Sequence, residues 1–83
     1  MGSTDEGIDP RWARVGRRLK EMRRLHEMTQ QVMAERCYVT QSAVSAWERG
    51  AKCPSLTTQH RIADVLHVSR SMLFAELDDG IAA

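Results

Sequence analysis

Residues 29–50 read TQQVMAERCYVTQSAVSAWERG and contain two short amphipathic segments with a brief break between them. Thr29 and Thr40 each stand directly before one segment. A threonine side chain accepts a hydrogen bond from the first turn of a helix, so both residues are predicted N-caps. Gly50 follows the second segment and can adopt the left-handed backbone that ends many helices. The stretch therefore predicts a helix of about two turns after Thr29 and another between Thr40 and Gly50.

The spacing of apolar residues in this stretch fits two helices that cross at a tight turn. Counted from Gln30, the fifth position must be small because the helices meet there, and it is Ala34. The fourth, eighth, tenth, fifteenth and eighteenth positions must be apolar to fill the space between the helices. These positions hold Met33, Cys37, Val39, Val44 and Trp47. All six demands are met, which predicts a helix-turn-helix and places Trp47 in the core rather than against a base.

Three further helices are predicted outside this stretch. Asp9 and Pro10 supply a cap and a first-turn proline for a helix that runs to about His26, with an apolar stripe at steps of three and four. Ser55 caps a fourth helix and Ser69 a short fifth one. No long β-type alternation competes. The sequence predicts an all-α domain over residues 9–78, a disordered segment over residues 1–8 and a short tail over residues 79–83.

The fifth predicted helix carries more apolar residues than one small core is expected to absorb. With 83 residues and only four aromatic ones, the chain is close to the lower size limit for independent stability. Such a surplus suggests contact with a second subunit. The residues predicted for a homodimer interface are Met72, Phe74 and Leu77.

Charge is distributed unevenly, although the net charge is only +1. Residues 10–52 hold ten basic and four acidic side chains, a net charge of +6, whereas both flanking regions are acidic. A polyanion is the natural partner of the basic region, and an arginine-rich solvated helix face is the alternative.

Other classes of function find little support in the sequence. His26, His60, His67, Cys37 and Cys53 lack the short-range pairing of zinc sites, so no metal and no cofactor are expected. No nucleophile, base and orienting group can be named together, which argues against an enzyme. The basic first helix needs its apolar stripe for the core, so no membrane contact is expected. Without a secretory leader or a long apolar run, we expect a cytoplasmic protein, associated with the nucleoid when bound to DNA.

Two quoted segments carry a resemblance to a known family. These are LKEMRRLHEMTQQVMAERCYVTQSAVSAWERGAKCPS and IADVLHVSRSMLFAEL. Together they are similar to the phage-repressor and Cro-like helix-turn-helix family, also called the xenobiotic-response-element family, over roughly residues 12–77. The resemblance implies a compact five-helix, lambda-repressor-like domain. It also implies a homodimeric transcriptional regulator, most simply a repressor, that reads a near-palindromic double-stranded DNA operator with its third helix in the major groove.

The resemblance also implies roles for individual residues. Bases are expected to be read by Gln41, Ser42, Ser45, Ala46 and Arg49. Phosphates are expected to be held by Thr29, Gln30, Thr40, Lys52 and Arg23. Glutamine and serine suit base edges chemically, whereas Arg49 can reach either a phosphate or a guanine, and the sequence does not decide between them. Arg23 is also expected to form an internal ion pair with Glu48.

The chain departs from the family pattern at several positions. Tyr38, Glu27 and His67 stand where the family often has glycine, so Tyr38 must accept a left-handed backbone or alter the turn. Gln59 and His60 occupy a region that is usually apolar, which suggests a looser core or a polar contact to a partner.

Several biological settings share this plan. They are a phage or general repressor, a restriction-modification controller, and an antitoxin that also binds a toxin protein and represses its own promoter. RNA polymerase is a further possible partner. Besides regulators and antitoxins, a third class is a protein-interaction module that does not bind DNA. The basic middle of the chain argues against this class.

Overall fold

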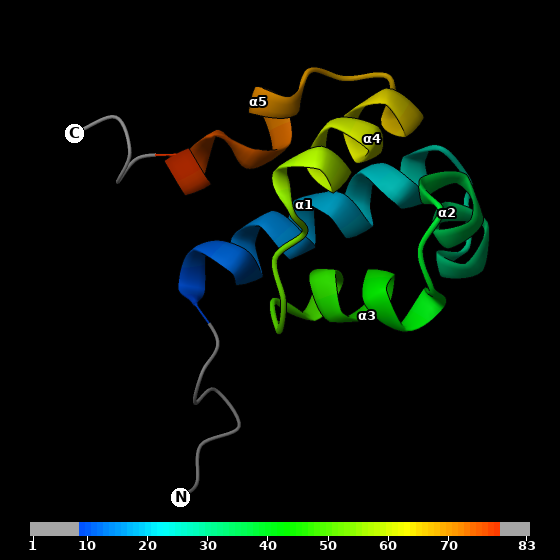
Figure 1. The fold of residues 1–83 in the computed structure, drawn as a ribbon, viewed down its shortest axis with the longest axis horizontal. Coiled ribbons are helices and arrows are strands. Elements are labelled where there is room, and N and C mark those ends of the chain that lie inside the picture. Colours follow the sequence, from blue (N-terminus) through cyan, green and yellow to red (C-terminus); the bar gives the residue numbers. More distant parts are fainter. Residues whose placement is uncertain (1–8, 79–83) are drawn as a thin grey trace, which may run out of the picture.

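The computed structural model describes residues 9–78, in which five α-helices and a final 3-10 turn enclose one core (Figure 1). The predicted disordered segment 1–8 and the tail 79–83 lie outside the described residues. The helices are α1 (Pro10–Leu25), α2 (Gln30–Cys37), α3 (Gln41–Arg49), α4 (Leu56–Leu66) and α5 (Arg70–Phe74), followed by η1 (Ala75–Asp78). The all-α, five-helix prediction is confirmed.

Four of the five predicted N-caps accept hydrogen bonds from the first turn of their helices. Asp9 Oδ1 accepts from Arg11 N at 2.8 Å, and the Thr29 hydroxyl accepts from the N–H of Val32 at 3.1 Å. Thr40 and Ser55 act in the same way at 3.1 and 3.3 Å. Ser69 precedes α5 without a side-chain cap. Local sequence therefore determines where the first four helices begin.

Three helix ends use a left-handed backbone at a residue other than glycine. Glu27, Tyr38 and His67 have φ of 56°, 59° and 57°. At the turn between α2 and α3, Tyr38 N–H donates to the carbonyl of Glu35 at 3.3 Å. The turn thus keeps its geometry, and Tyr38 bears a strain of about 1–2 kcal/mol. The Arg61 guanidinium lies 5.1 Å from the Tyr38 ring centre, which offsets part of this cost.

The core is formed by apolar side chains from all five helices. Its largest fully buried members are Phe74, Leu19, Met33, Ile62, Leu66, Leu73, Val44 and Cys37. The sequence-based assignment of Phe74 to a dimer interface is therefore wrong. The ring is 0% exposed because α5 packs against α4 and α1, with this side chain directed into the core. Leu56, the first residue of α4, lies outside this core and is 58% exposed.

The crossing of α1 and α3 is unusually close and determines how α3 is presented. A Cβ atom on Gly16 would lie 2.3 Å from the carbonyl oxygen of Trp47 and 2.7 Å from that of Glu48. Only glycine allows this approach. Trp47 packs into the core at 6% exposure, as predicted, and so holds α3 from its inner side.

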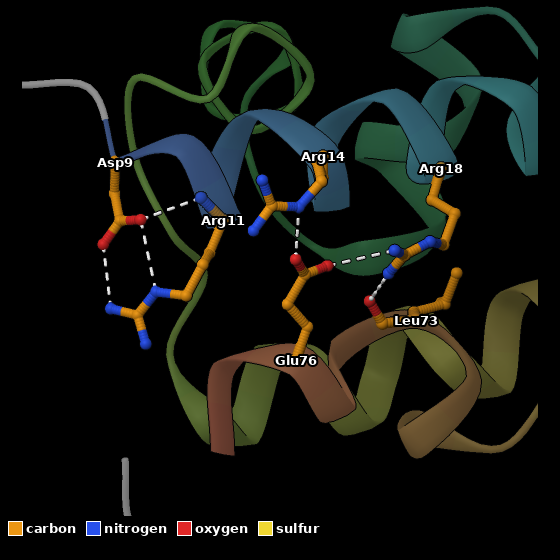
Figure 2. Close-up of polar contacts among 6 residues, drawn as sticks. All are labelled: Asp9, Arg11, Arg14, Arg18, Leu73 and Glu76. Carbon is orange, nitrogen blue, oxygen red and sulfur yellow. Dashed lines mark hydrogen bonds and ion pairs between the residues drawn. The ribbon is translucent and has the colours of Figure 1, made fainter. Parts of the chain in front are cut away.

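Polar contacts fasten η1 to α1 on another side of the molecule (Figure 2). The carboxylate of Glu76 accepts hydrogen bonds from Arg14 and Arg18, and Arg18 also donates to the carbonyl of Leu73 at 3.1 Å. These two arginines hold the pKa of Glu76 below its usual value, with Arg14 making the larger contribution. The chain after α5 is therefore secured by charge-assisted hydrogen bonds.

Gln59 belongs to a second set of polar contacts and does not indicate a loose core. Its Nε2 donates to the carbonyl of Pro54 at 2.9 Å, and its Oε1 accepts from Arg70 Nε at 2.8 Å. Arg70 also donates two hydrogen bonds of 2.9 Å to Asp78, which lower the pKa of that carboxyl. Both functional ends of the Gln59 amide are thus satisfied within the chain, whereas His60 is exposed.

Candidate nucleic-acid interface

The outer face of α3 carries a row of short polar side chains that ends in one cation. Gln41, Ser42 and Arg49 are exposed and Ser45 is half-buried. Arg49 Nε donates to the Ser45 hydroxyl at 3.4 Å, one helical turn earlier. Val44 and Trp47 hold the opposite side in the core. This arrangement presents hydrogen-bonding groups outward on a helix whose position is determined by packing.

Ala46 does not belong to that outer face. Only 8% of it is exposed, and its carbonyl accepts hydrogen bonds from the N–H groups of Ala51 and Lys52, at 2.9 and 3.4 Å. The chain folds back over this residue immediately after Gly50. The expectation that Ala46 contacts a base is therefore not supported.

The N-termini of α2 and α3 are the expected anion-binding elements. Thr29 and Thr40 are exposed at these ends, and each hydroxyl caps its own helix while keeping a proton to donate. The first N–H groups of a helix lack partners within the helix, and the helix dipole favours an anion there. Both threonines therefore lie where a phosphate group can be held.

Arg23, Glu48 and Gln30 form a buried network that joins α1, α2 and α3. Arg23 Nε and NH2 donate to Glu48 at 2.6 and 3.0 Å, and NH1 donates to the carbonyl of Met28 at 2.8 Å. The exposed fractions of the two charged side chains are only 9% and 4%. Its hydrogen bond to Glu48 raises the pKa of Arg23, so the guanidinium stays charged. The predicted ion pair between these residues is present.

The same network changes two of the predicted phosphate contacts. Arg23 is 7% exposed and all three of its nitrogens already have partners, so its assignment to phosphate binding is wrong. Gln30 Nε2 donates to Glu48 Oε1 at 3.0 Å, which holds its amide at the edge of α2. Gln30 is half-buried and keeps a second Nε2 proton for an external acceptor.

The loop after α3 places Lys52 outward while Gly50 packs against α1. Gly50 has φ of 77°, and a Cβ atom there would lie 2.7 Å from the Cα of Ala13. Lys52 is exposed and makes no side-chain hydrogen bond or ion pair to residues 9–78. Its ammonium group is therefore available to an anion beside α3.

Sequence reasoning overlooked two features that shape this interface. Gly16 was not singled out, although a glycine within a predicted helix signals a close approach of another backbone. The hydrogen bond from Gln30 to Glu48 carried no local signal, because 18 positions separate the two residues.

Other kinds of site find no basis in the described part of the chain. Within residues 9–78, no group of three or more potential ligands lies close enough to hold a metal ion. Cys37 and Cys53 are free thiols, and burial raises the pKa of each. No helix among these residues is long and apolar enough to cross a membrane.

Comparison with known proteins identifies the same architecture. The helix-turn-helix family HTH_3 matches residues 19–73. The restriction-modification controller protein C.AhdI from Aeromonas hydrophila is 28% identical, with a TM-score of 0.73, over 76% of this chain and 96% of its own. SinR, the master regulator for biofilm formation, solved in complex with DNA, is 30% identical, with a TM-score of 0.67, over 71% of this chain and 95% of its own.

A third structure extends the likeness in fold. The clp gene regulator ClgR from Corynebacterium glutamicum is 23% identical, with a TM-score of 0.75, over 90% of this chain and 80% of its own. At that identity the likeness concerns the fold alone. A search of curated proteins found no match.

Proposed function

This chain belongs to the HTH_3 helix-turn-helix family of DNA-binding transcriptional regulators, and from that premise we propose that it is a homodimeric repressor of a near-palindromic operator. In the proposed complex, α3 lies in the major groove and the N-termini of α2 and α3 rest on the sugar-phosphate backbone. Occupation of the operator excludes RNA polymerase from the promoter. Regulation rather than catalysis is the role of this family.

One observation carries the proposal: the outer face of α3 is polar, exposed and held rigidly from behind. Gln41 and Ser42 are exposed at the N-terminal end of α3, where a recognition helix meets base edges. A glutamine amide can both donate to and accept from adenine, and a serine hydroxyl can serve several bases. The Arg23–Glu48 ion pair and the buried Trp47 hold α3 against α1, and the close backbone contact at Gly16 sets the distance between the two helices. The side chains of α3 therefore meet DNA in one orientation.

Phosphate contacts in the proposed complex come from four residues. Thr29 and Thr40 supply hydroxyl groups beside helix N-termini, Gln30 supplies an amide held by Glu48, and Lys52 supplies a charge. None of these contacts distinguishes one base from another. They determine the register of the protein on the duplex and most of its salt-dependent affinity.

The proposed reading requires a dimer, because two copies of α3 are needed to span a palindrome. Met72 is 63% exposed and remains our choice for the interface. Leu77 is half-buried and lines a cavity of about 350 Å³ together with Leu56 and Trp12. An apolar side chain of a second copy would bury this surface. Two-fold symmetry then places the half-sites about 34 Å apart, one helical turn of DNA.

A restriction-modification controller is the second setting that a specific observation favours. C.AhdI is described as such a controller, and this chain aligns with 96% of its length. A controller of this kind uses the same operator chemistry, so the two readings differ only in the gene that is regulated.

Selection of genomic fragments by the purified protein tests the proposal. We expect one near-palindromic motif to be enriched and the affinity for it to fall steeply with salt, because several phosphates are neutralised. Genes beside the enriched sites distinguish a modification operon from other targets. Absence of any enriched motif, or binding that is insensitive to salt, would contradict the proposed function.

A further inference from the structure

One side of α1 carries three basic side chains that have no partner among residues 9–78. Arg17, Lys20 and Arg24 are all exposed, and none makes a side-chain hydrogen bond or ion pair with residues 9–78. They follow one another at steps of three and four, so they form one stripe along about 10 Å of the helix. We call these three residues the α1 basic stripe.

Other arginines of α1 are neutralised, which sets the stripe apart. Arg14 and Arg18 are paired with Glu76, and Arg23 is paired with Glu48. Arg14 and Arg18 contact η1, as Figure 2 shows, so their charge is used within the fold. The side chains of the α1 basic stripe, in contrast, make no hydrogen bond or ion pair within residues 9–78. Glu21 is the exposed carboxylate nearest in sequence, and in the described part of the chain it too forms no ion pair.

The position of the stripe follows from the contacts of its neighbours with α3. Gly16 touches the last turn of α3, and Arg23 binds Glu48 of the same turn. Lys20 lies four residues after Gly16 and three before Arg23, so helical spacing directs it toward the same side of α1. Arg17 directly follows Gly16 and Arg24 directly follows Arg23, so both lie about a quarter turn further round the helix, at the exposed edge of that side. The stripe therefore borders the C-terminal end of α3, and α1 and α3 lie side by side in Figure 1.

We propose that the α1 basic stripe binds the DNA backbone beside the half-site that α3 reads. This inference rests on the proposed DNA binding and extends it to a longer duplex. A duplex carries one negative charge per roughly 1.7 Å of its axis, so a 10 Å row of three cations faces several phosphates. Like charges three and four residues apart on a helix repel one another, so a bound anion relieves a repulsion within the stripe. DNA that passes this border supplies the anion.

The contacts carry no sequence information, because phosphates are the same at every position. The stripe is therefore expected to lengthen the footprint and raise the affinity for all duplexes alike. Short duplexes that end at the half-site lose this contribution, whereas longer ones retain it.

The test compares Lys20→Ala and the triple variant R17A/K20A/R24A with the control Arg14→Ala. Lys20→Ala and Arg14→Ala each remove one positive charge, but Arg14 faces η1. Binding is measured by fluorescence anisotropy at several salt concentrations, on a selected operator duplex with long flanks and on the same duplex trimmed to its motif. Circular dichroism confirms that each variant is folded.

We expect the slope of log affinity against log salt on the long duplex to shrink by about 0.9 for each phosphate contact removed in each protomer. Lys20→Ala should show this loss and Arg14→Ala should not. On the trimmed duplex the triple variant should match the wild type. If the variants keep the wild-type slope on the long duplex while the wild type still binds its operator, the proposed role of the stripe is contradicted and the proposed function is not. If the wild type selects no motif at all, the proposed function itself fails.

Discussion

Glu48 of α3 accepts hydrogen bonds of 2.6 and 3.0 Å from Arg23 of α1, and it does so almost entirely out of contact with water. The same carboxylate accepts a hydrogen bond from Gln30 of α2. One side chain thus joins the three helices that make up the reading surface. Its role is structural, because no face of it is presented to a ligand.

Replacing Glu48 with alanine should destabilise the fold strongly. The change leaves the Arg23 guanidinium buried without its partner, and loss of one member of a buried ion pair costs about 3–5 kcal/mol. Urea denaturation measures the free energy of unfolding. The exposed Glu35 forms no ion pair with residues 9–78 and provides a control, since Glu35→Ala should change stability by less than about 0.5 kcal/mol. Similar losses of unfolding free energy for both variants would show that the Arg23–Glu48 ion pair does not stabilise the fold.

Gln41→Ala and Lys52→Ala should weaken DNA binding in different ways. Loss of the Gln41 amide should cost about 1–3 kcal/mol and relax the preference at one base position. Loss of the Lys52 charge should weaken all sequences alike and lower the salt slope by about 1 for each protomer bound. Binding to the operator and to single-base variants of it separates these effects. Equal loss of selectivity from both substitutions would refute the division of roles.

Met72→Glu should convert the proposed dimer to a monomer without a large loss of stability. Met72 is 63% exposed, so a charge there is solvated in the monomer but buried and unpaired in the proposed interface. Light scattering measures the molar mass. Phe74→Ala is the contrast, because it leaves a cavity in the core and should cost about 3–5 kcal/mol. A Met72→Glu protein that remains dimeric would place the interface elsewhere.

Tyr38→Gly should be more stable than Tyr38→Ala by about 1 kcal/mol. Both variants lose the contact between the Tyr38 ring and Arg61, so their difference reports the backbone at φ of 59°. Alanine retains the left-handed strain of about 1–2 kcal/mol, whereas glycine relieves it. Part of this stabilisation is offset, because glycine gives the unfolded chain more conformational freedom. Thermal unfolding provides the comparison. Equal stability would mean that the turn relaxes to another geometry.

Acid should loosen the attachment of η1 to α1. Arg14 and Arg18 lower the pKa of Glu76 below the ordinary 4.5, so the unfolded chain binds a proton at a higher pH than the folded one. The stabilisation is therefore complete above pH about 5 and is lost as the pH falls through the lowered pKa. We expect the Tm of Glu76→Gln to decline less than that of the wild type between pH about 5 and about 3.

Glu35→Gln is the control for this acid effect, because Glu35 forms no ion pair with residues 9–78. Its Tm should decline with acid as steeply as that of the wild type. A wild-type decline equal to that of Glu76→Gln would mean that the contacts of Glu76 with α1 do not stabilise the fold.

The starts of the first four helices could be predicted from the sequence because their causes are local. Asp9, Thr29, Thr40 and Ser55 cap the helices they were expected to cap, and Gly50 ends α3 in the left-handed conformation. The Arg23–Glu48 pair was inferred from resemblance rather than from spacing, since 25 positions separate the two residues. Such contacts depend on how helices cross.

The sequence by itself determined the order and the first residues of the first four helices, the end of α3 at Gly50, the crossing of α2 and α3, and the polar row that begins at Gln41. Capping and helical periodicity act over a few residues, so these features follow from neighbours in the chain. Tertiary structure decided which of the apolar and basic residues remain exposed to solvent or to a partner. Packing buried Phe74 and Ala46, closed Arg23 within an ion pair and left Leu56 exposed, because burial depends on what lies across the helix from each side chain.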